Sequence, residues 1–352
     1  MRDAPPLKPP AVRPGDRLAV VAPASPFSGE AFDAGVGELR RLGFDPVFDA
    51  RVFDRRRYRA GDAAARAAAL MTAWMDPGIP AILAARGGYG SVELLPFLSV
   101  DAMRQSPKLL VGFSDITALL AFLTTRCGIV ALHGPCVAAG LDGGPAAYDE
   151  STFVGALTRG EPLGLLAAPA LEALSPGEAV GPLYGGNLTQ LAASLGTPYA
   201  FDPPAGCVLF LEDVGERPYR IDRLLTQLAF SGVLERAGAV VFGQLPGCDE
   251  PDGTVTARDV VADALHRFPG PVLWGLPAGH TVGPALTLPL GVRARVAAGP
   301  PPLVEILESA VADGCESRIP PLDVARGGPE FVEGPNPEPR IPNPESRDRS
   351  HL

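Results

Sequence analysis

The sequence is poor in cysteine, in basic charge and in long apolar runs. Its five cysteines are scattered with no CxxC pair, which excludes a disulfide framework or a zinc site and indicates reduced thiols in the core. The net charge of −10 argues against nucleic acid or an anionic membrane as a partner. No segment approaches the roughly 20 apolar residues of a membrane span, and the early run LAVVAPA reads as a first strand rather than a signal peptide. We therefore expect a soluble, cytoplasmic protein.

The composition is that of a globular protein, with 46% hydrophobic and 20% charged residues. The length of 352 residues is typical of about two domains. In the first part, short apolar runs alternate with stretches of helical periodicity, which predicts parallel βαβ units in a doubly wound sheet. We expect this N-terminal α/β domain to span residues 1–140. Its predicted strands are 17–24, 81–85, 108–113 and 129–135, and its predicted helices are 28–42, 61–75 and 116–126.

Beyond it, residues 141–180 are rich in Gly, Ala and Pro and are predicted as a linker with a short helix. A second α/β domain with a mixed sheet is expected over 181–324. Its predicted elements are a turn feeding a helix (181–198), strands 207–213, 239–245 and 271–276, helices 217–235 and 255–268, and antiparallel strands in ALTLPLG and VRARVAA. The polar, Pro-rich tail 325–352 is predicted to be disordered and to have no function.

Four polar groups follow predicted strands, where sites form in parallel α/β sheets. Ser114 and Asp115 lie at a strand-to-helix corner in LLVGFSDITALL. A nucleophilic serine needs such a corner, although the GxSxG pattern is only half met, because Ile116 occupies the position of its second glycine. The alternative interpretation is that Ser114 or Asp115 simply caps the following helix.

The other candidates are an acid, a base and a glycine-rich loop. Glu212 ends an apolar strand and would orient a histidine, or else pair with Arg217, Arg220 or Arg223, while Asp213 and Glu216 compete for its role. Of the four histidines, His280 and His133 are the possible bases, and either could be structural.

The loop Arg86-Gly87-Gly88-Tyr89-Gly90 matches neither common phosphate-binding pattern, but its amides could form half of an oxyanion hole. Arg86 would bind a substrate carboxylate or form a structural ion pair.

These residues resemble the LD-carboxypeptidase family of serine peptidases, which includes the microcin C immunity-type peptidases. The resemblance spans about residues 17–300 in family order. The matching stretches are VVAPAS (20–25), AARGGYGS (84–91), LVGFSDITALL (110–120), HGP (133–135), YGGNLTQLAASLGTPY (184–199), LFLEDVGERPYRIDRLLTQL (209–228), GLPAGH (275–280) and TLPLG (287–291).

The resemblance implies a triad of Ser114 as nucleophile, Glu212 as acid and His280 as base. It also implies an oxyanion hole of the Gly88 and Asp115 amides. Arg86, Tyr89 and Asn187 are candidate substrate-binding residues.

In the carboxypeptidase branch the substrate would be a murein tetrapeptide, cut between meso-diaminopimelate and terminal D-alanine during cell-wall recycling. In the immunity branch it would be an aminoacyl- or peptidyl-nucleotide, whose base is expected to stack on aromatic residues, often Trp. Residues 138–180 hold no Trp, and the sequence's two, Trp74 and Trp274, lie elsewhere, which favours the first branch. The family further implies a homodimer and no metal or cofactor.

Overall fold

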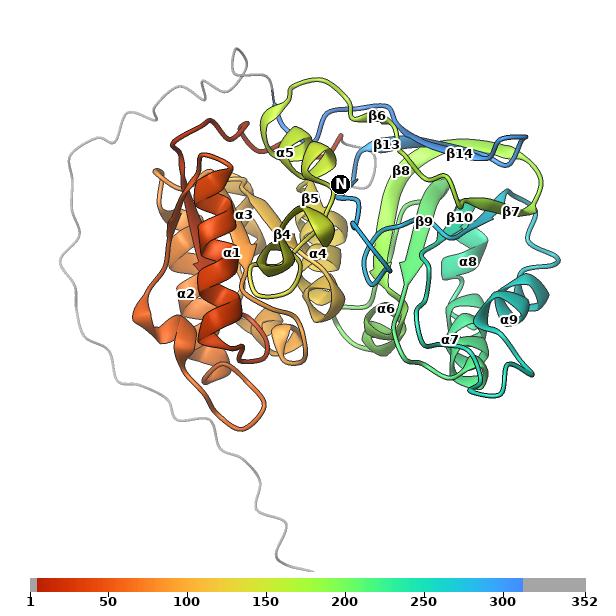
Figure 1. The fold of residues 1–352 in the computed structure, drawn as a ribbon, viewed down its shortest axis with the longest axis horizontal. Helices are drawn as coiled ribbons and strands as arrows, with labels where there is room; N and C mark the ends of the chain where they lie inside the picture. Colours follow the sequence, from red (N-terminus) through yellow and green to blue (C-terminus); the bar gives the residue numbers. More distant parts are fainter. Residues whose placement is uncertain (1–4, 313–352) are drawn as a thin grey trace, which may run out of the picture. The chain divides into compact units, whose positions relative to one another are not determined.

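The computed structural model describes residues 5–312, in which the chain forms two sheets flanked by helices (Figure 1). Within these residues the first sheet has six strands in the order β12-β5-β4-β3-β1-β2. All neighbours are parallel except β12, which runs antiparallel to β5. The strands are Arg17–Val21 (β1), Asp45–Val47 (β2), Ala81–Ala84 (β3), Leu109–Gly112 (β4), Ala131–His133 (β5) and Leu288–Leu290 (β12).

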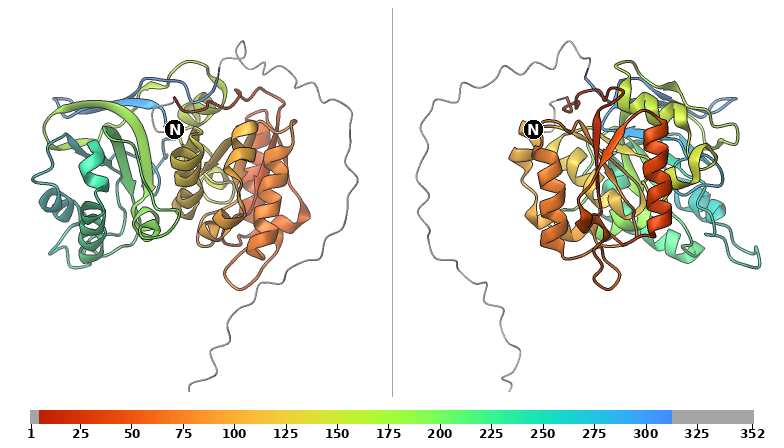
Figure 2. Two further views of the ribbon diagram at one scale, coloured as in Figure 1. Left: turned by 180° about the vertical axis from the view of Figure 1, so that it is seen from behind. Right: turned by 60° about the vertical axis from the view of Figure 1, so that its left-hand side comes forward.

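Helices cover both faces of the first sheet, as expected for a doubly wound α/β domain. Figure 2 shows helix α1 on one side of the sheet and α2 on the other. Ser28 caps the start of helix α1, because its side chain accepts a hydrogen bond from the Ala31 amide, and the helix buries Phe32 and Leu39 against the sheet. The helices of this part are Gly29–Arg41 (α1), Ala63–Met75 (α2), Val100–Gln105 (α3), Thr117–Phe122 (α4) and Glu150–Thr158 (α5).

The second sheet is mixed, with the order β6-β14-β13-β8-β9-β10-β11-β7 in the described part of the chain. Strands β8 to β11 are parallel, and antiparallel strands flank them on both sides. Its strands are Gly164–Leu165 (β6), Glu172–Ser175 (β7), Glu178–Asn187 (β8), Cys207–Glu212 (β9), Ala237–Phe242 (β10), Val272–Trp274 (β11), Arg293–Ala297 (β13) and Leu303–Ile306 (β14). Its helices are Leu188–Ser194 (α6), Pro218–Phe230 (α7), Val233–Arg236 (α8) and Ala257–Ala264 (α9).

Alternation along β9 decides which way its side chains point. Leu209 and Leu211 belong to the core beneath α7 and α9, whereas Val208 and Phe210 belong to the core shared with the first sheet. Because successive strand residues face opposite sides, Glu212 emerges on the Phe210 side. Burial of both faces explains why β9 is a continuous apolar run until this acid.

One predicted element was wrong. Residues 181–187 were expected as a turn, but they form the end of β8, between β9 and β13. Their glycines allow a close approach of chains: a Cβ on Gly185 would lie 1.8 Å from the Phe210 carbonyl oxygen, and one on Gly181 would lie 1.9 Å from the Gly206 carbonyl oxygen.

Several other features differ from the expectations in detail. The predicted helix 217–235 is interrupted at Gly232, which is left-handed and separates α7 from α8. The expected linker holds α5, β6 and β7, and β12 joins the first sheet from the later part of the chain. The domain boundaries themselves stay a prediction, and residues 313–352, including the tail, lie outside the described residues.

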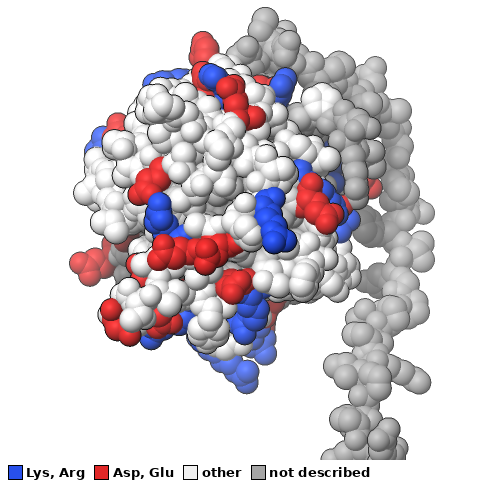
Figure 3. Space-filling model, turned by 90° about the vertical axis from the view of Figure 1, so that its right-hand side faces the viewer, with Lys and Arg blue, Asp and Glu red and all other residues white. Residues whose placement is uncertain are grey.

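The distribution of surface charge and the character of the helices indicate which kinds of partner the described residues suit. On the face shown in Figure 3, neutral residues cover most of the described surface, and acidic and basic side chains lie in small groups near one another. Among residues 5–312, none of the helices combines the length and apolar character required to cross a bilayer.

Candidate active site

Ser114 occupies a strained corner between β4 and α4. Its φ is +61°, in the left-handed region that a side chain disfavours, and it opens a 3₁₀ turn, Ser114–Ile116, that leads into the helix. The turn is so tight that a Cβ on Gly112 would lie only 2.8 Å from Ile116 Cγ2. A serine forced into such a conformation at the end of a parallel strand has the geometry of a nucleophile elbow.

The glycine-rich loop packs directly on this serine. A Cβ on Gly87 would lie 3.0 Å from Ser114 Cβ and 3.3 Å from Ser114 Oγ. Gly88 has a φ of +104°, and a Cβ there would lie 2.4 Å from Ser25 Oγ. The same Ser25 hydroxyl accepts a hydrogen bond from the Tyr89 amide at 3.0 Å and donates to the Tyr58 carbonyl. Ser25 thus anchors the loop, in which Gly87 lies next to Ser114.

Asp115 connects the two predicted halves of the oxyanion hole. Its buried carboxylate accepts a hydrogen bond from the Ser91 amide at 2.8 Å, and its carbonyl oxygen accepts one from the Ser91 hydroxyl at 2.5 Å. Burial raises the pKa of Asp115, and the hydrogen bonds from Ser91 and Gly90 counteract that rise. The corner after β4 is therefore fastened to the end of the Arg86–Gly90 loop.

The three candidate substrate-binding residues have different surroundings. Arg86 is exposed and donates to the Pro26 carbonyl oxygen at 3.0 Å. Tyr89 is 45% exposed and its ring lies edge-on to Tyr58. Asn187 is buried, caps α6 through the Gln190 amide, and donates from Nδ2 to Asp213 Oδ1 at 3.0 Å, so both ends of its side chain bind protein groups.

Glu212 and His280 form a direct pair. Glu212 is fully buried, and its Oε2 accepts from His280 Nδ1 at 2.7 Å and from the His280 amide at 2.9 Å. Gly279, with a φ of +75°, allows this approach, because a Cβ there would lie 2.6 Å from Glu212 Cδ. The backbone and side chain of His280 are therefore both positioned by one carboxylate oxygen.

Burial and the neighbouring charges shift the pKa values of Glu212 and His280 in opposite directions. Burial favours the neutral carboxyl of Glu212, but the interactions with His133 and His280 outweigh it and hold its pKa well below its usual range. Burial likewise opposes the charged form of His280, yet the bond to Glu212 raises the pKa of His280 above its ordinary value. The pair therefore favours an ionised acid beside a histidine that can accept a proton.

The alternatives to Glu212 are engaged elsewhere. Asp213 accepts hydrogen bonds from Asn187 and Thr189, and Glu216 is paired with Arg220 at 3.3 Å. Arg217, considered as a structural partner for Glu212, is paired with Glu250 instead. None of these contacts reaches His280.

A cavity of about 560 Å³ opens beside His280. Phe113, the residue before Ser114, lines it, and its ring lies 5.0 Å from that of His280, centroid to centroid. His280 is 21% exposed, whereas the side chain of His133 is wholly buried. Of the two possible bases, only His280 therefore faces a space that a substrate could enter.

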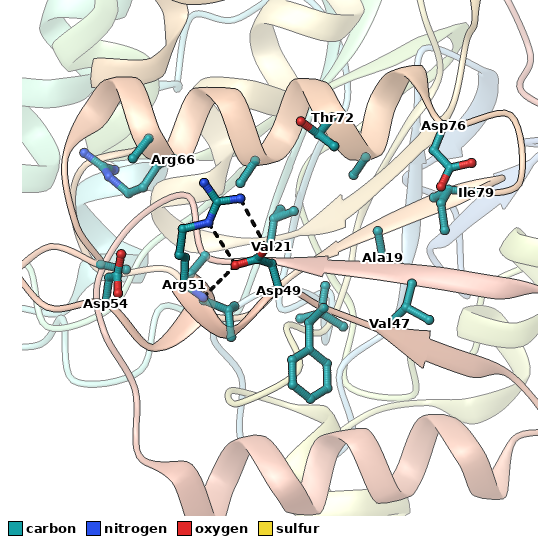
Figure 4. A pocket seen from close by; sticks show the side chains of 18 of the residues that line it. Ala19, Val21, Val47, Asp49, Arg51, Asp54, Arg66, Thr72, Asp76 and Ile79 are labelled. Atoms are coloured by element: carbon teal, nitrogen blue, oxygen red, sulfur yellow. Dashed lines mark hydrogen bonds and ion pairs between the residues drawn. The ribbon is translucent and has the colours of Figure 1, made fainter.

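A separate cavity of about 310 Å³ lies between α2 and strands β1 and β2 (Figure 4). Arg51 and Asp49 form an ion pair at its wall, and alanine and valine side chains make up much of the rest. It contains none of the predicted site residues.

Two residues of the site escaped the sequence analysis. Ser25, which anchors the glycine-rich loop, closes the stretch VVAPAS and could have been found there because it follows the first strand. Ser91, which binds Asp115, closes the stretch AARGGYGS, but the sequence does not show its contact with Asp115, a residue distant along the chain.

Comparison with known proteins identifies the family. Residues 18–134 match the LD-carboxypeptidase N-terminal domain, and residues 180–296 match the LD-carboxypeptidase C-terminal domain. This chain belongs to the LD-carboxypeptidase family. The resemblance stated from the motifs is thereby confirmed.

Individual members of the LD-carboxypeptidase family are similar over most of the chain. A putative carboxypeptidase of Streptomyces coelicolor is 43% identical over 294 residues, covering 82% of this chain and 93% of that protein. The murein tetrapeptide carboxypeptidase of Pseudomonas aeruginosa is 35% identical over 271 residues, covering 75% and 88%. The structure of the microcin C7 self-immunity protein MccF in complex with aspartyl sulfamoyl adenosine superposes with a TM-score of 0.81 at 26% identity, covering 87% of this chain and all of that one.

Proposed function

We propose that this protein is a serine carboxypeptidase that hydrolyses the L,D-peptide bond between meso-diaminopimelate and terminal D-alanine in murein tetrapeptides. The observation that carries the proposal is the buried Glu212–His280 pair at a cavity lined by Phe113, which directly precedes a serine in a left-handed conformation. The similarity to the murein tetrapeptide carboxypeptidase supports the choice of substrate. We further propose that it acts in the cytoplasm as a homodimer.

The proposed chemistry is acyl transfer. His280 Nε2 takes the proton of the Ser114 hydroxyl while Ser114 Oγ attacks the amide carbonyl carbon. The amides of Gly88 and Asp115 would donate to the oxyanion, and Glu212 stabilises the imidazolium through Nδ1. His280 then gives its proton to the departing amine of D-alanine, and water, activated by the same imidazole, hydrolyses the acyl-enzyme.

A second candidate substrate is an aminoacyl- or peptidyl-nucleotide. The similarity to MccF in complex with aspartyl sulfamoyl adenosine supports it. So does the exposed pair of Tyr58 and Tyr89, the second of which belongs to the glycine-rich loop, because this surface is suited to stacking a base. The segment 138–180, which lacks Trp, argues for the murein peptide instead.

Mass spectrometry of the murein tetrapeptide incubated with wild type and with Ser114→Ala tests the proposal. We expect loss of one alanine with wild type only, because no other group replaces the nucleophile. Ser231→Ala, at an exposed serine after α7, is the matched control and should cleave like wild type. An intact tetrapeptide in all samples would contradict the proposed substrate, and cleavage of aminoacyl sulfamoyl adenosine by wild type would then establish the second candidate.

A further inference from the structure

His133 is a buried imidazole that the proposed mechanism does not use. Its side chain is fully buried between the rings of Phe113 and Phe210, with centroid distances of 6.3 and 5.3 Å. Within residues 5–312, neither of its ring nitrogens has a hydrogen-bond partner. Leaving a buried donor unsatisfied costs about 1–3 kcal/mol, so an apolar residue would suit a purely structural role better.

Glu212 has an unsatisfied atom that faces this imidazole. Its Oε2 accepts two hydrogen bonds from His280, while its Oε1 accepts none from any described residue. His133 Nε2 lies 3.7 Å from that Oε1. Shortening the gap by about 0.7 Å would give an ordinary N–H···O hydrogen bond and satisfy both atoms.

The two residues come from different sheets. His133 ends β5 and is paired in register with Gly112 of β4, just before the nucleophile corner. Glu212 ends β9 of the second sheet. A contact between them therefore fixes the acid, and through it His280, relative to the strand that carries Ser114. Catalysis by a serine and a histidine depends on the distance between their side chains, since small misplacements reduce rates strongly.

We propose that His133 is a positioning residue whose Nε2–H donates to Glu212 Oε1, so that two histidines hold one carboxylate from opposite sides. The inference rests on the proposed function, because it gives His133 a role through Glu212 and His280. Besides Glu212, the charged groups near His280 are Asp213, which follows β9, and Asp142, on the wall of the same cavity.

The test uses two variants of almost equal size. His133→Gln retains an N–H donor, whereas His133→Leu removes it and leaves Oε1 with no donor. We expect kcat on the tetrapeptide to fall about 10- to 100-fold in His133→Leu, with KM nearly unchanged, and to recover largely in His133→Gln.

The pH dependence separates positioning from packing. Without the His133 donor, the charge of Glu212 concentrates on Oε2 and attracts the His280 proton more strongly. We therefore expect the pKa of His280, measured by NMR titration of the full chain, to rise by about half a unit or more in His133→Leu, and to return towards the wild-type value in His133→Gln. An unchanged His280 pKa in a folded His133→Leu, or equal behaviour of the two variants, overturns the proposal.

Two outcomes remain informative if activity or folding fails. When wild type cleaves no amide tested, the proposed function fails, but the NMR titration still decides whether His133 acts on His280 through Glu212. When His133→Leu does not fold, the ¹⁵N shifts of the imidazole in wild type decide instead. A proton on Nε2 supports the proposal, and an Nε2 without a proton overturns it.

Discussion

The corner that carries Ser114 and the strand end that carries Glu212 are the two parts of the proposed site, and they are built differently. Around Ser114 the geometry comes from the backbone: a left-handed serine, a close approach at Gly87 and a positive φ at Gly88. Around Glu212 it comes from side chains, because a buried carboxylate holds His280 through two hydrogen bonds. The first region is thus sensitive to an added Cβ, and the second to a lost charge.

The difference follows from what each group must do. A nucleophile needs exposure, which a sharp turn provides at some cost in conformational energy. A base needs a fixed orientation and a stable conjugate acid, which a buried anion provides at some cost in desolvation. In the proposed mechanism, each cost falls on a residue that takes part in the chemistry.

The largest effect on activity is expected from removing the negative charge of Glu212. Glu212→Gln preserves the shape of the side chain but removes the anion that stabilises the imidazolium, so we expect kcat/KM to fall by about 10³- to 10⁴-fold. Because Glu212 raises the pKa of His280, its removal should move the acid limb of the pH–rate profile to lower pH, the direction opposite to that expected for His133→Leu.

Steady-state kinetics across pH would check this, with Glu216→Gln as the matched control. Glu216 is paired only with Arg220 in the described contacts, and its substitution should leave the profile unchanged. Full activity of Glu212→Gln would show that the buried charge has no role in the site.

The sequence predicts part of the fold around Ser114 and around Glu212. Strands β1, β3, β4 and β9 were predicted because their apolar runs stop at polar residues. Those polar ends also identified Ser114 and Glu212 as candidates, since parallel strands end at a common edge. The end of β8 was not predicted, because glycines that permit close chain approach also favour turns.

Contacts between the sheets could not be predicted. The 3.7 Å approach of His133 to Glu212 joins residues far apart in sequence. The alternation of β9 predicts which face Glu212 occupies but not which residue of the other sheet meets it. Within the first sheet, the anchoring of the glycine-rich loop by Ser25 likewise joins residues that are far apart in sequence.

The next largest effect on activity is expected from crowding the backbone around Ser114. Gly87 has an ordinary φ, so Gly87→Ala is conformationally allowed, but its Cβ would lie 3.3 Å from Ser114 Oγ, tighter than most contacts. We expect this crowding to displace the nucleophile and lower kcat about 10²-fold without unfolding the protein. Gly37→Ala, in α1 with open space around it, is the control and should keep full activity with a slightly higher Tm. Equal activity of both variants would mean that the loop does not constrain Ser114.

The smallest effect measures the conformational cost at Ser114 directly. A left-handed φ disfavours any Cβ, so Ser114→Gly should have a free energy of unfolding about 1 kcal/mol higher than Ser114→Ala, although both lack the nucleophile. At Ser231, whose φ is −81°, the same two substitutions should rank in the opposite order, because there glycine only adds freedom to the unfolded chain. Urea unfolding of the four variants gives both differences. If alanine were the more stable residue at both positions, the nucleophile corner would carry no strain, and the two regions of the site would not differ in the way their backbones suggest.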